Sequence, residues 1–144
     1  MNRHTCDDGF HIKTTLLKGI TWDFNDPRSP DGSAKFGAGV VFSEAIKEAS
    51  ERGLYLATGW AATVGVVGWA LGGGHGPFAS QLGLGVDNTL EVEIILANGT
   101  LVTANDQQNT DLYWALRGGG GSAWGIITSI TYRAFKSPQG GFTM

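Results

Sequence analysis

The sequence predicts an α+β fold in which a mixed or antiparallel sheet carries flanking helices. Two segments, 90–104 and 125–135, alternate apolar and polar residues with the period of two that is typical of half-buried strands. Two others, 43–53 and 110–118, combine helical periodicity with residues that begin and end helices. A chain of 144 residues is long enough for one domain with one core.

The first part of the chain is expected to form strands around a polar bend. Residues 10–24 are predicted to form short strands, and residues 34–42 a further strand. Between them, residues 25–33 are rich in Asn, Asp, Pro, Gly and Ser. This composition is typical of a long loop, with a linker as the alternative.

The helix predicted at 43–53 is defined by its ends. Ser43 is the candidate N-cap, because its hydroxyl can accept a backbone N–H of the first turn. Gly53 follows the last periodic residue and marks the C-terminal end. Ala45, Ile46 and Ala49 are expected to share one face of this helix.

A β-hairpin is the clearest local prediction. Its first strand places four apolar side chains on one face: Leu90, Val92, Ile94 and Leu96. The dipeptide Asn98-Gly99 then favours a tight turn with positive φ. After the hairpin come the helix at 110–118, closed by Gly118, and the strand at 125–135.

Composition excludes several classes of function. Ten basic and thirteen acidic residues give a net charge of -3 without a block of like charge, so nucleic acid is not an expected partner. The single cysteine, Cys6, and three scattered histidines provide no metal-ligand spacing. We expect a soluble protein, because the sequence shows neither a signal peptide nor an apolar run long enough to span a bilayer.

Glycines are concentrated in two segments, 65–76 and 118–125. Neither segment is a GxGxxG fingerprint, since "GGGHGP" ends in proline and "GGGGSAWG" lacks the third glycine. Exposed backbone N–H groups can form an anion-binding concavity that a pyrophosphate approaches closely. The composition alone leaves open whether these glycines bind a dinucleotide or only form tight turns.

The order of three sequence blocks resembles a known family. The blocks are "GWAATVGVVGWALGGGHG", "LGLGVDNTLEVEIILANGTLVTAN" and "NTDLYWALRGGGGSAWGIITSITYRAF". They resemble the FAD-binding (PCMH-type) domain of the berberine bridge enzyme-like oxidases in the vanillyl-alcohol oxidase superfamily. The resemblance covers nearly all of 1–144 and implies a partial domain, with the flavin-linking histidine loop, the substrate domain and the C-terminal segment absent.

The resemblance implies an FAD site on the glycine-rich loops. Bulky substitutions of the loop glycines are expected to block the phosphate while leaving the fold intact. His75 is expected to pack or hydrogen-bond within its loop rather than act as a base. Asp87 either holds its loop by accepting backbone N–H groups or forms a turn without contacting the cofactor. The residues implied in FAD binding are Thr63, Val64, Gly65, Gly68, Gly72, Gly73, Gly74, His75, Gly76, Leu84, Asp87, Asn88, Gly125, Ile126 and Ile127.

Departures from the family pattern qualify this expectation. Relatives with doubly linked flavin carry a cysteine at the position of Ala61, so a cysteinyl bond is excluded here. His4 lies near the expected histidine loop but lacks its paired glycines, and Val67 replaces a common glycine. No residue of this chain is assigned a catalytic role.

The resemblance implies two alternative functions. The first is a part of an FAD-dependent oxidase that transfers hydride from an alcohol, carbohydrate or amine to flavin N5, with oxygen as the acceptor. The second is a non-catalytic truncated product that binds FAD weakly or not at all. Asn98-Gly99-Thr100 is also a glycosylation sequon, which indicates either that a longer parent protein is secreted and glycosylated at Asn98 or that Asn98 serves only the turn.

Overall fold

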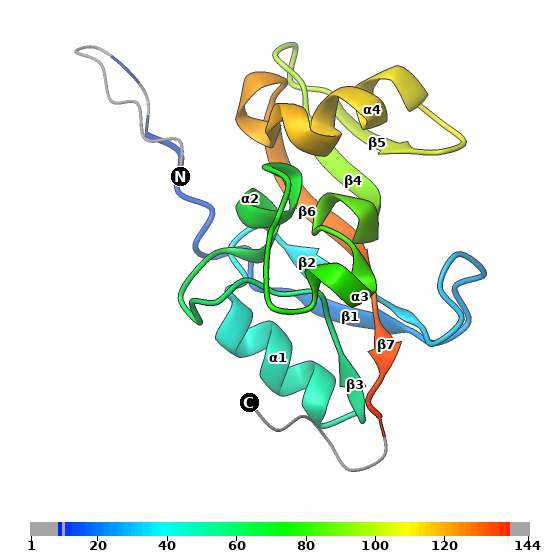
Figure 1. The fold of residues 1–144 in the computed structure, drawn as a ribbon. Coiled ribbons are helices and arrows are strands. Elements are labelled where there is room, and N and C mark those ends of the chain that lie inside the picture. Colours follow the sequence, from blue (N-terminus) through cyan, green and yellow to red (C-terminus); the bar gives the residue numbers. More distant parts are fainter. Residues whose placement is uncertain (1–8, 10, 139–144) are drawn as a thin grey trace.

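A five-stranded antiparallel sheet forms the centre of the protein (Figure 1). The computed structural model describes residue 9 and residues 11–138. The strands of the sheet are β1 (Ile20–Asp23), β2 (Ser33–Gly37), β4 (Thr89–Ile95), β5 (Leu101–Asn105) and β6 (Ile126–Arg133), in the spatial order β1-β2-β6-β4-β5. A separate pair joins β3 (Leu54–Tyr55) to β7 (Phe135–Lys136). The predicted α+β class with an antiparallel sheet is confirmed.

Short helices flank the sheet. They are α1 (Phe42–Ser50), α2 (Val66–Leu71), α3 (Ala79–Leu82) and α4 (Thr110–Gly119), with the 3-10 turns η1 (Val86–Asn88) and η2 (Gly121–Ala123). In α4, Arg117 and Gly118 leave the helical conformation, and Gly118 has a φ of +104°. Gly118 therefore ends the regular helix, as predicted. No helix in residues 11–138 is both long enough and apolar enough to cross a membrane.

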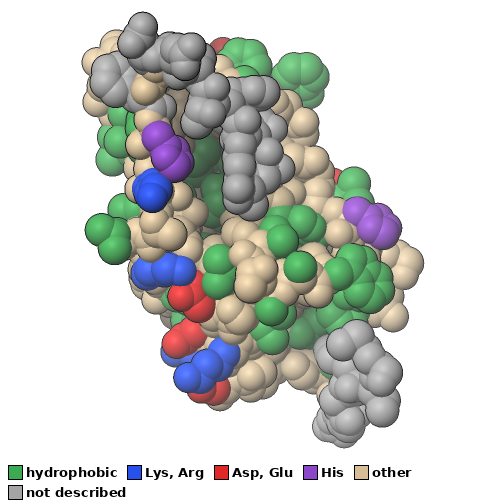
Figure 2. Space-filling model, turned by 90° about the vertical axis from the view of Figure 1, so that its left-hand side faces the viewer, with side chains coloured by type: hydrophobic (Ala, Val, Ile, Leu, Met, Phe, Trp, Pro, Cys, Tyr) green, Lys and Arg blue, Asp and Glu red, His purple; other side chains and the backbone are tan. Residues whose placement is uncertain are grey.

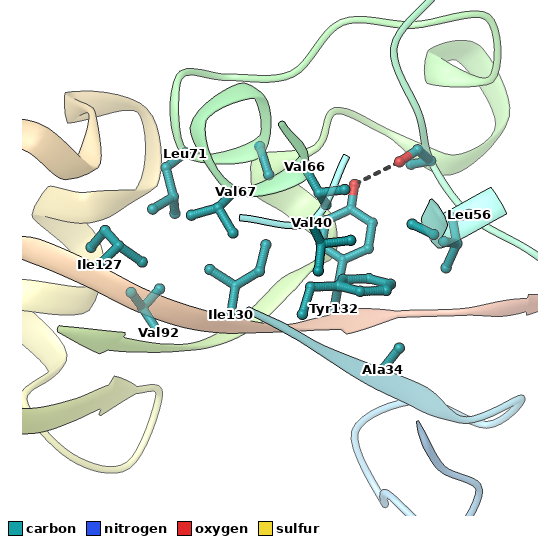
Figure 3. Close-up of a cluster of buried hydrophobic side chains, with 14 of the residues drawn as sticks. Ala34, Val40, Leu56, Val66, Val67, Leu71, Val92, Ile127, Ile130 and Tyr132 are labelled. Carbon is teal, nitrogen blue, oxygen red and sulfur yellow. Dashed lines mark hydrogen bonds between the residues drawn. The ribbon is translucent and has the colours of Figure 1, made fainter. Parts of the chain in front are cut away.

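The core lies between α2 and the middle of the sheet (Figure 3). The α2 side chains of Val66, Val67 and Leu71 lie over Val92, Ile127 and Ile130 (Figure 3). Beside them the buried Tyr132 hydroxyl donates a hydrogen bond to the Ala57 carbonyl at 3.0 Å. Burial raises the pKa of Tyr132 well above its usual range, so the phenol stays neutral and can donate this bond. The bond ties β6 to the segment that precedes α2.

The β4–β5 hairpin forms as predicted. Leu90, Val92 and Ile94 are buried, and Ile95 pairs with Leu101 across the turn. The turn itself differs in one respect, because only Gly99 has a positive φ, at +82°. The Asn98 carboxamide oxygen instead accepts the Thr100 N–H at 3.0 Å, an interaction typical of Asn in turns.

Residues 24–32 form the loop of a β1–β2 hairpin, so the linker alternative is wrong. Asp26 organises this loop, because its carboxylate accepts two hydrogen bonds from Arg28 at 2.9 Å and one from Ser33 at 2.7 Å. These bonds hold the pKa of Asp26 well below its usual range. Of the strands expected in 10–24, the described residues form only β1, although the carbonyls of Gly19 and Leu17 accept the N–H groups of Gly37 and Gly39 just before it.

The N-cap of the first predicted helix lies two residues earlier than expected. Val41 rather than Ser43 is the N-cap of α1, and the Glu44 carboxylate accepts the Val41 N–H at 2.9 Å. The buried face runs through Phe42, Ala45 and Ala49. Ile46, which was expected to share the face of Ala45 and Ala49, is 44% exposed. Once Phe42 is a buried position, the 3.6-residue period moves Ile46 to the flank of that face.

Candidate functional site

A groove of about 910 Å³ lies beside α2 and collects most of the predicted site residues. It is formed by α2, the loops on both sides of α2, and the segment that leads from η2 into β6. The predicted residues that line it are Val64, Gly65, Gly68, Gly72, Gly74, His75, Gly125, Ile126 and Ile127. The two glycine-rich segments, which are far apart in the sequence, therefore line the same groove.

The groove is lined by apolar side chains and by backbone. Of the described residues that line it, only His75 has a titratable side chain. Figure 2 shows the face that carries α1 and α2, with charged side chains gathered toward one edge and apolar side chains and backbone over much of the rest. A ligand in the groove would therefore meet hydrocarbon and peptide groups rather than fixed charges.

Some groove glycines face open space. A Cβ added to Gly68 or Gly120 would meet no atom within 4 Å, and one added to Gly65 would meet only the Val40 carbonyl oxygen at 3.9 Å. Gly68 lies inside α2 and does not have a positive φ. Glycine in a helix interior is less stable than alanine by about 1 kcal/mol. Neither backbone conformation nor packing therefore requires glycine at position 68.

Other glycines are required by the fold itself. Gly74 has a φ of +76°, and its Cβ would lie 2.8 Å from the Gly85 Cα. A Cβ on Gly76 would collide with the Thr58 carbonyl, and one on Gly121 would lie 2.6 Å from the Ile127 side chain. The expectation that bulk at any loop glycine spares the fold is therefore wrong for Gly74 and Gly76.

Six predicted residues do not line the groove: Thr63, Gly73, Gly76, Leu84, Asp87 and Asn88. Three of them form a self-contained turn, in which Asp87 accepts the Leu84 N–H at 2.8 Å. Asn88 donates to the carbonyls of Leu82 and Leu84, both at 2.9 Å. Asp87 does hold its loop by accepting a backbone N–H, and its side chain lines a different cavity.

His75 contributes its backbone rather than its imidazole to the loop. The side chain is exposed at the groove, and the His75 carbonyl accepts the Trp69 indole N–H at 3.2 Å. Trp69 also packs edge-on against Phe42, with ring centroids 5.0 Å apart. Among the residues that the structure describes, the imidazole forms no hydrogen bond, so of the two expected alternatives, packing or hydrogen bonding, the hydrogen bond is absent.

Several groove residues were not predicted from the sequence: Ile12, Thr14, Ala38, Val67, Trp69, Leu71, Gly120 and Gly121. Trp69 and Leu71 resemble ordinary core residues, and Ile12, Thr14 and Ala38 reach the groove only through long-range packing. Val67 is 4% exposed and packs into the core. Ala61 is exposed in the loop before α2, and His4 lies outside the described residues.

Comparison with known proteins gives consistent matches. The family described as FAD binding domain matches residues 1–105. An uncharacterized FAD-linked oxidoreductase of Arthroderma benhamiae is 40% identical over 96% of this chain and 25% of its own length. This chain spans about a quarter of the length of such relatives.

Solved structures agree with this match. A VAO-type flavoprotein from Myceliophthora thermophila superposes with a TM-score of 0.81 at 37% identity, over 85% of this chain and 23% of that chain. The glucooligosaccharide oxidase of Acremonium strictum superposes with a TM-score of 0.78 at 30% identity, over 87% of this chain and 25% of that chain. That oxidase is described with a 6-S-cysteinyl, 8α-N1-histidyl FAD.

Proposed function

This chain belongs to the FAD-linked oxidoreductases, and from this we propose that its groove holds part of FAD for the oxidation of a small molecule. FAD is the cofactor of this family. The observation that carries the proposal is Gly68, a helical glycine that faces open space in the groove. Close approach of a ligand to the backbone would explain why this position is glycine, which the fold itself does not explain.

The residues present fit FAD. The groove volume of about 910 Å³ lies in the range of roughly 300–1,000 Å³ that is usual for ligand pockets. Gly65, Gly68 and Gly120 leave room for a diphosphate against the backbone, and no acidic side chain lines the groove to repel it. Burial of a diphosphate beside uncharged peptide groups is favourable only where N–H groups face it, which the glycine-rich backbone allows.

The proposed reaction is oxidation of an alcohol, carbohydrate or amine. When bound, FAD supplies the hydride acceptor at N5, with oxygen as the proposed final electron acceptor. The residues of this chain bind and orient the cofactor, while Val64, Ile126 and Ile127 keep water from the apolar side of the groove. His75 is exposed and positioned by its backbone alone, so we assign no proton transfer to it.

Ala61 limits how the flavin can be attached. The position matches the cysteine of doubly linked relatives, and a methyl group cannot form a thioether. We propose that any covalent link to the flavin in this protein is not cysteinyl.

Anaerobic reduction tests the proposed function. The purified protein should show a flavin spectrum that one class of alcohol, carbohydrate or amine bleaches without oxygen and that oxygen restores. Protein that purifies without flavin and fails to take up added FAD would contradict FAD binding. Bound flavin that no compound of these three classes reduces would contradict the oxidase proposal while leaving cofactor binding intact.

A further inference from the structure

A second cavity, of about 420 Å³, lies where the start of β4, the end of β6 and α4 meet. It shares no lining residue with the groove beside α2. Three guanidinium groups line it, from Arg28, Arg117 and Arg133. These three arginines are far apart in the sequence, so the fold itself brings their positive charges together.

Among the described residues, only Arg28 of these three arginines has a carboxylate partner. Arg28 binds Asp26 at 2.9 Å and Glu91 at 3.4 Å. Arg117 stacks over the Tyr113 ring, 4.7 Å from its centroid, and donates a long hydrogen bond of 3.5 Å to the Tyr113 hydroxyl. Within the described part of the chain, neither Arg117 nor Arg133 forms an ion pair.

Arg133 carries an unsatisfied donor. Its Nη2 donates to the Arg28 carbonyl at 3.3 Å, while its Nε is buried and has no hydrogen-bond partner among the described residues. The Nε is closed to solvent, so an oxyanion in the cavity can reach only the terminal nitrogens of the Arg133 guanidinium. The guanidinium fork suits an oxyanion, which can accept two parallel N–H bonds.

Two carboxylates also line the cavity but leave these donors free. Asp87 accepts the Leu84 N–H, and Asp106 is exposed to solvent. The Tyr113 hydroxyl donates its proton to the Thr89 carbonyl at 2.6 Å, so it has no proton to donate to a ligand in the cavity. The Tyr113 hydroxyl oxygen can still accept a hydrogen bond, and it accepts one from Arg117. This bond keeps the Arg117 guanidinium beside the wall of the cavity.

We propose that this cavity binds a small oxyanion, a phosphate or a carboxylate, between Arg133 and Arg117. Arg133 supplies the terminal nitrogens of a guanidinium that forms no ion pair among the described residues, and Arg117 supplies a second guanidinium, stacked on the Tyr113 ring. Arg28 stabilises the fold but is not expected to bind the anion, because its N–H groups already donate to Asp26 and Glu91. The site is independent of the FAD groove and adds a second ligand to the protein.

Thermal unfolding of the FAD-bound protein tests the proposal, because bound FAD already occupies the other anion-accepting site. The probes are inorganic phosphate and acetate, each compared with sodium chloride at equal ionic strength to separate binding from screening. We expect phosphate or acetate to raise the Tm where chloride does not, and the more effective probe identifies the class of anion.

Variants locate the effect. Arg133→Gln and Arg117→Gln should each raise the Kd for the more effective anion by about tenfold or more, as expected for loss of a charge-assisted hydrogen bond. Arg52→Gln is the control, because Arg52 pairs with Glu48 on α1 and does not line the cavity. Arg117 is exposed, so Arg117→Gln is informative even if Arg133→Gln misfolds. Equal stabilisation by chloride, or undiminished binding in Arg117→Gln, would overturn the proposal.

Discussion

Substitution of Gly68 should have opposite effects on the stability of the fold and on the affinity for FAD. Gly68 lies inside α2, and its Cβ would meet no atom within 4 Å. Gly68→Ala should therefore stabilise the protein without FAD by about 0.5–1 kcal/mol, the usual difference between the two residues in a helix interior. Gly68→Val adds bulk on the same side, and its β-branch cancels part of that gain.

The same side chains should weaken FAD binding. A methyl group in the groove displaces a diphosphate from the backbone, and each charge-assisted hydrogen bond that is lost weakens binding by about 1.5–3 kcal/mol. Loss of one such bond corresponds to roughly a tenfold to hundredfold weaker Kd. Gly68→Val should weaken FAD binding more than Gly68→Ala does, because the valine side chain fills more of the groove.

The assay combines flavin content with thermal unfolding. Flavin per protein chain is measured from absorbance, Kd by titration of FAD-free protein, and Tm without FAD. Gly19→Ala is the matched control, since its Cβ also meets nothing within 4 Å and Gly19 does not line the groove. If Gly68→Val folds and binds FAD as tightly as the unchanged protein does, the groove is not the FAD site.

Four further predictions concern single positions. Ala61→Cys should increase the flavin that stays with protein after acid precipitation, whereas a cysteine that remains fully titratable as a free thiol would contradict the position of the flavin. Asp26→Asn should lower the free energy of unfolding at pH 7 by about 2–4 kcal/mol, because Arg28 loses a buried partner. Because the folded-state pKa of Asp26 is lowered, its contribution is full above its unfolded pKa of about 3.9 and disappears as pH falls through the folded pKa, so the deficit measured by urea unfolding should shrink in acid. Tyr132→Phe should reduce stability by about 1–3 kcal/mol, since the Ala57 carbonyl loses its buried donor, and an unchanged urea midpoint would refute this. Mass spectrometry of protein from its native host should find a glycan on Asn98, which is exposed at a hairpin turn, and an unmodified peptide would refute secretion with glycosylation at this residue.

Local patterns predicted those parts of the fold that local interactions determine. The β4–β5 hairpin followed from alternation in one strand and from Asn98-Gly99, because turn chemistry and period fix the register together. The end of α4 followed from Gly118, whose positive φ suits glycine. Ser43 was wrong as an N-cap because Phe42 is buried as the first helical residue, and this depends on tertiary packing.

The site was predictable only in part for a related reason. Glycine density indicated which loops approach a ligand, but the sequence does not distinguish Gly68, which faces open space, from Gly74, which packs against Gly85. Trp69 was not predicted as a groove residue, because the hydrogen bond from its indole N–H to the His75 carbonyl, which holds the loop, is visible only in the structure. The arginines of the second cavity gave no local signal, since Arg28 and Arg133 are 105 residues apart.

Hydrogen–deuterium exchange with and without FAD tests the central claim most directly. If the groove holds the cofactor, FAD should slow exchange in residues 64–75 and 120–127, which form its two sides, and leave the hairpin turn at 96–100 unchanged. Protection confined to other segments, with 64–75 exchanging at the same rate in both states, would contradict the assignment of the FAD site to this groove.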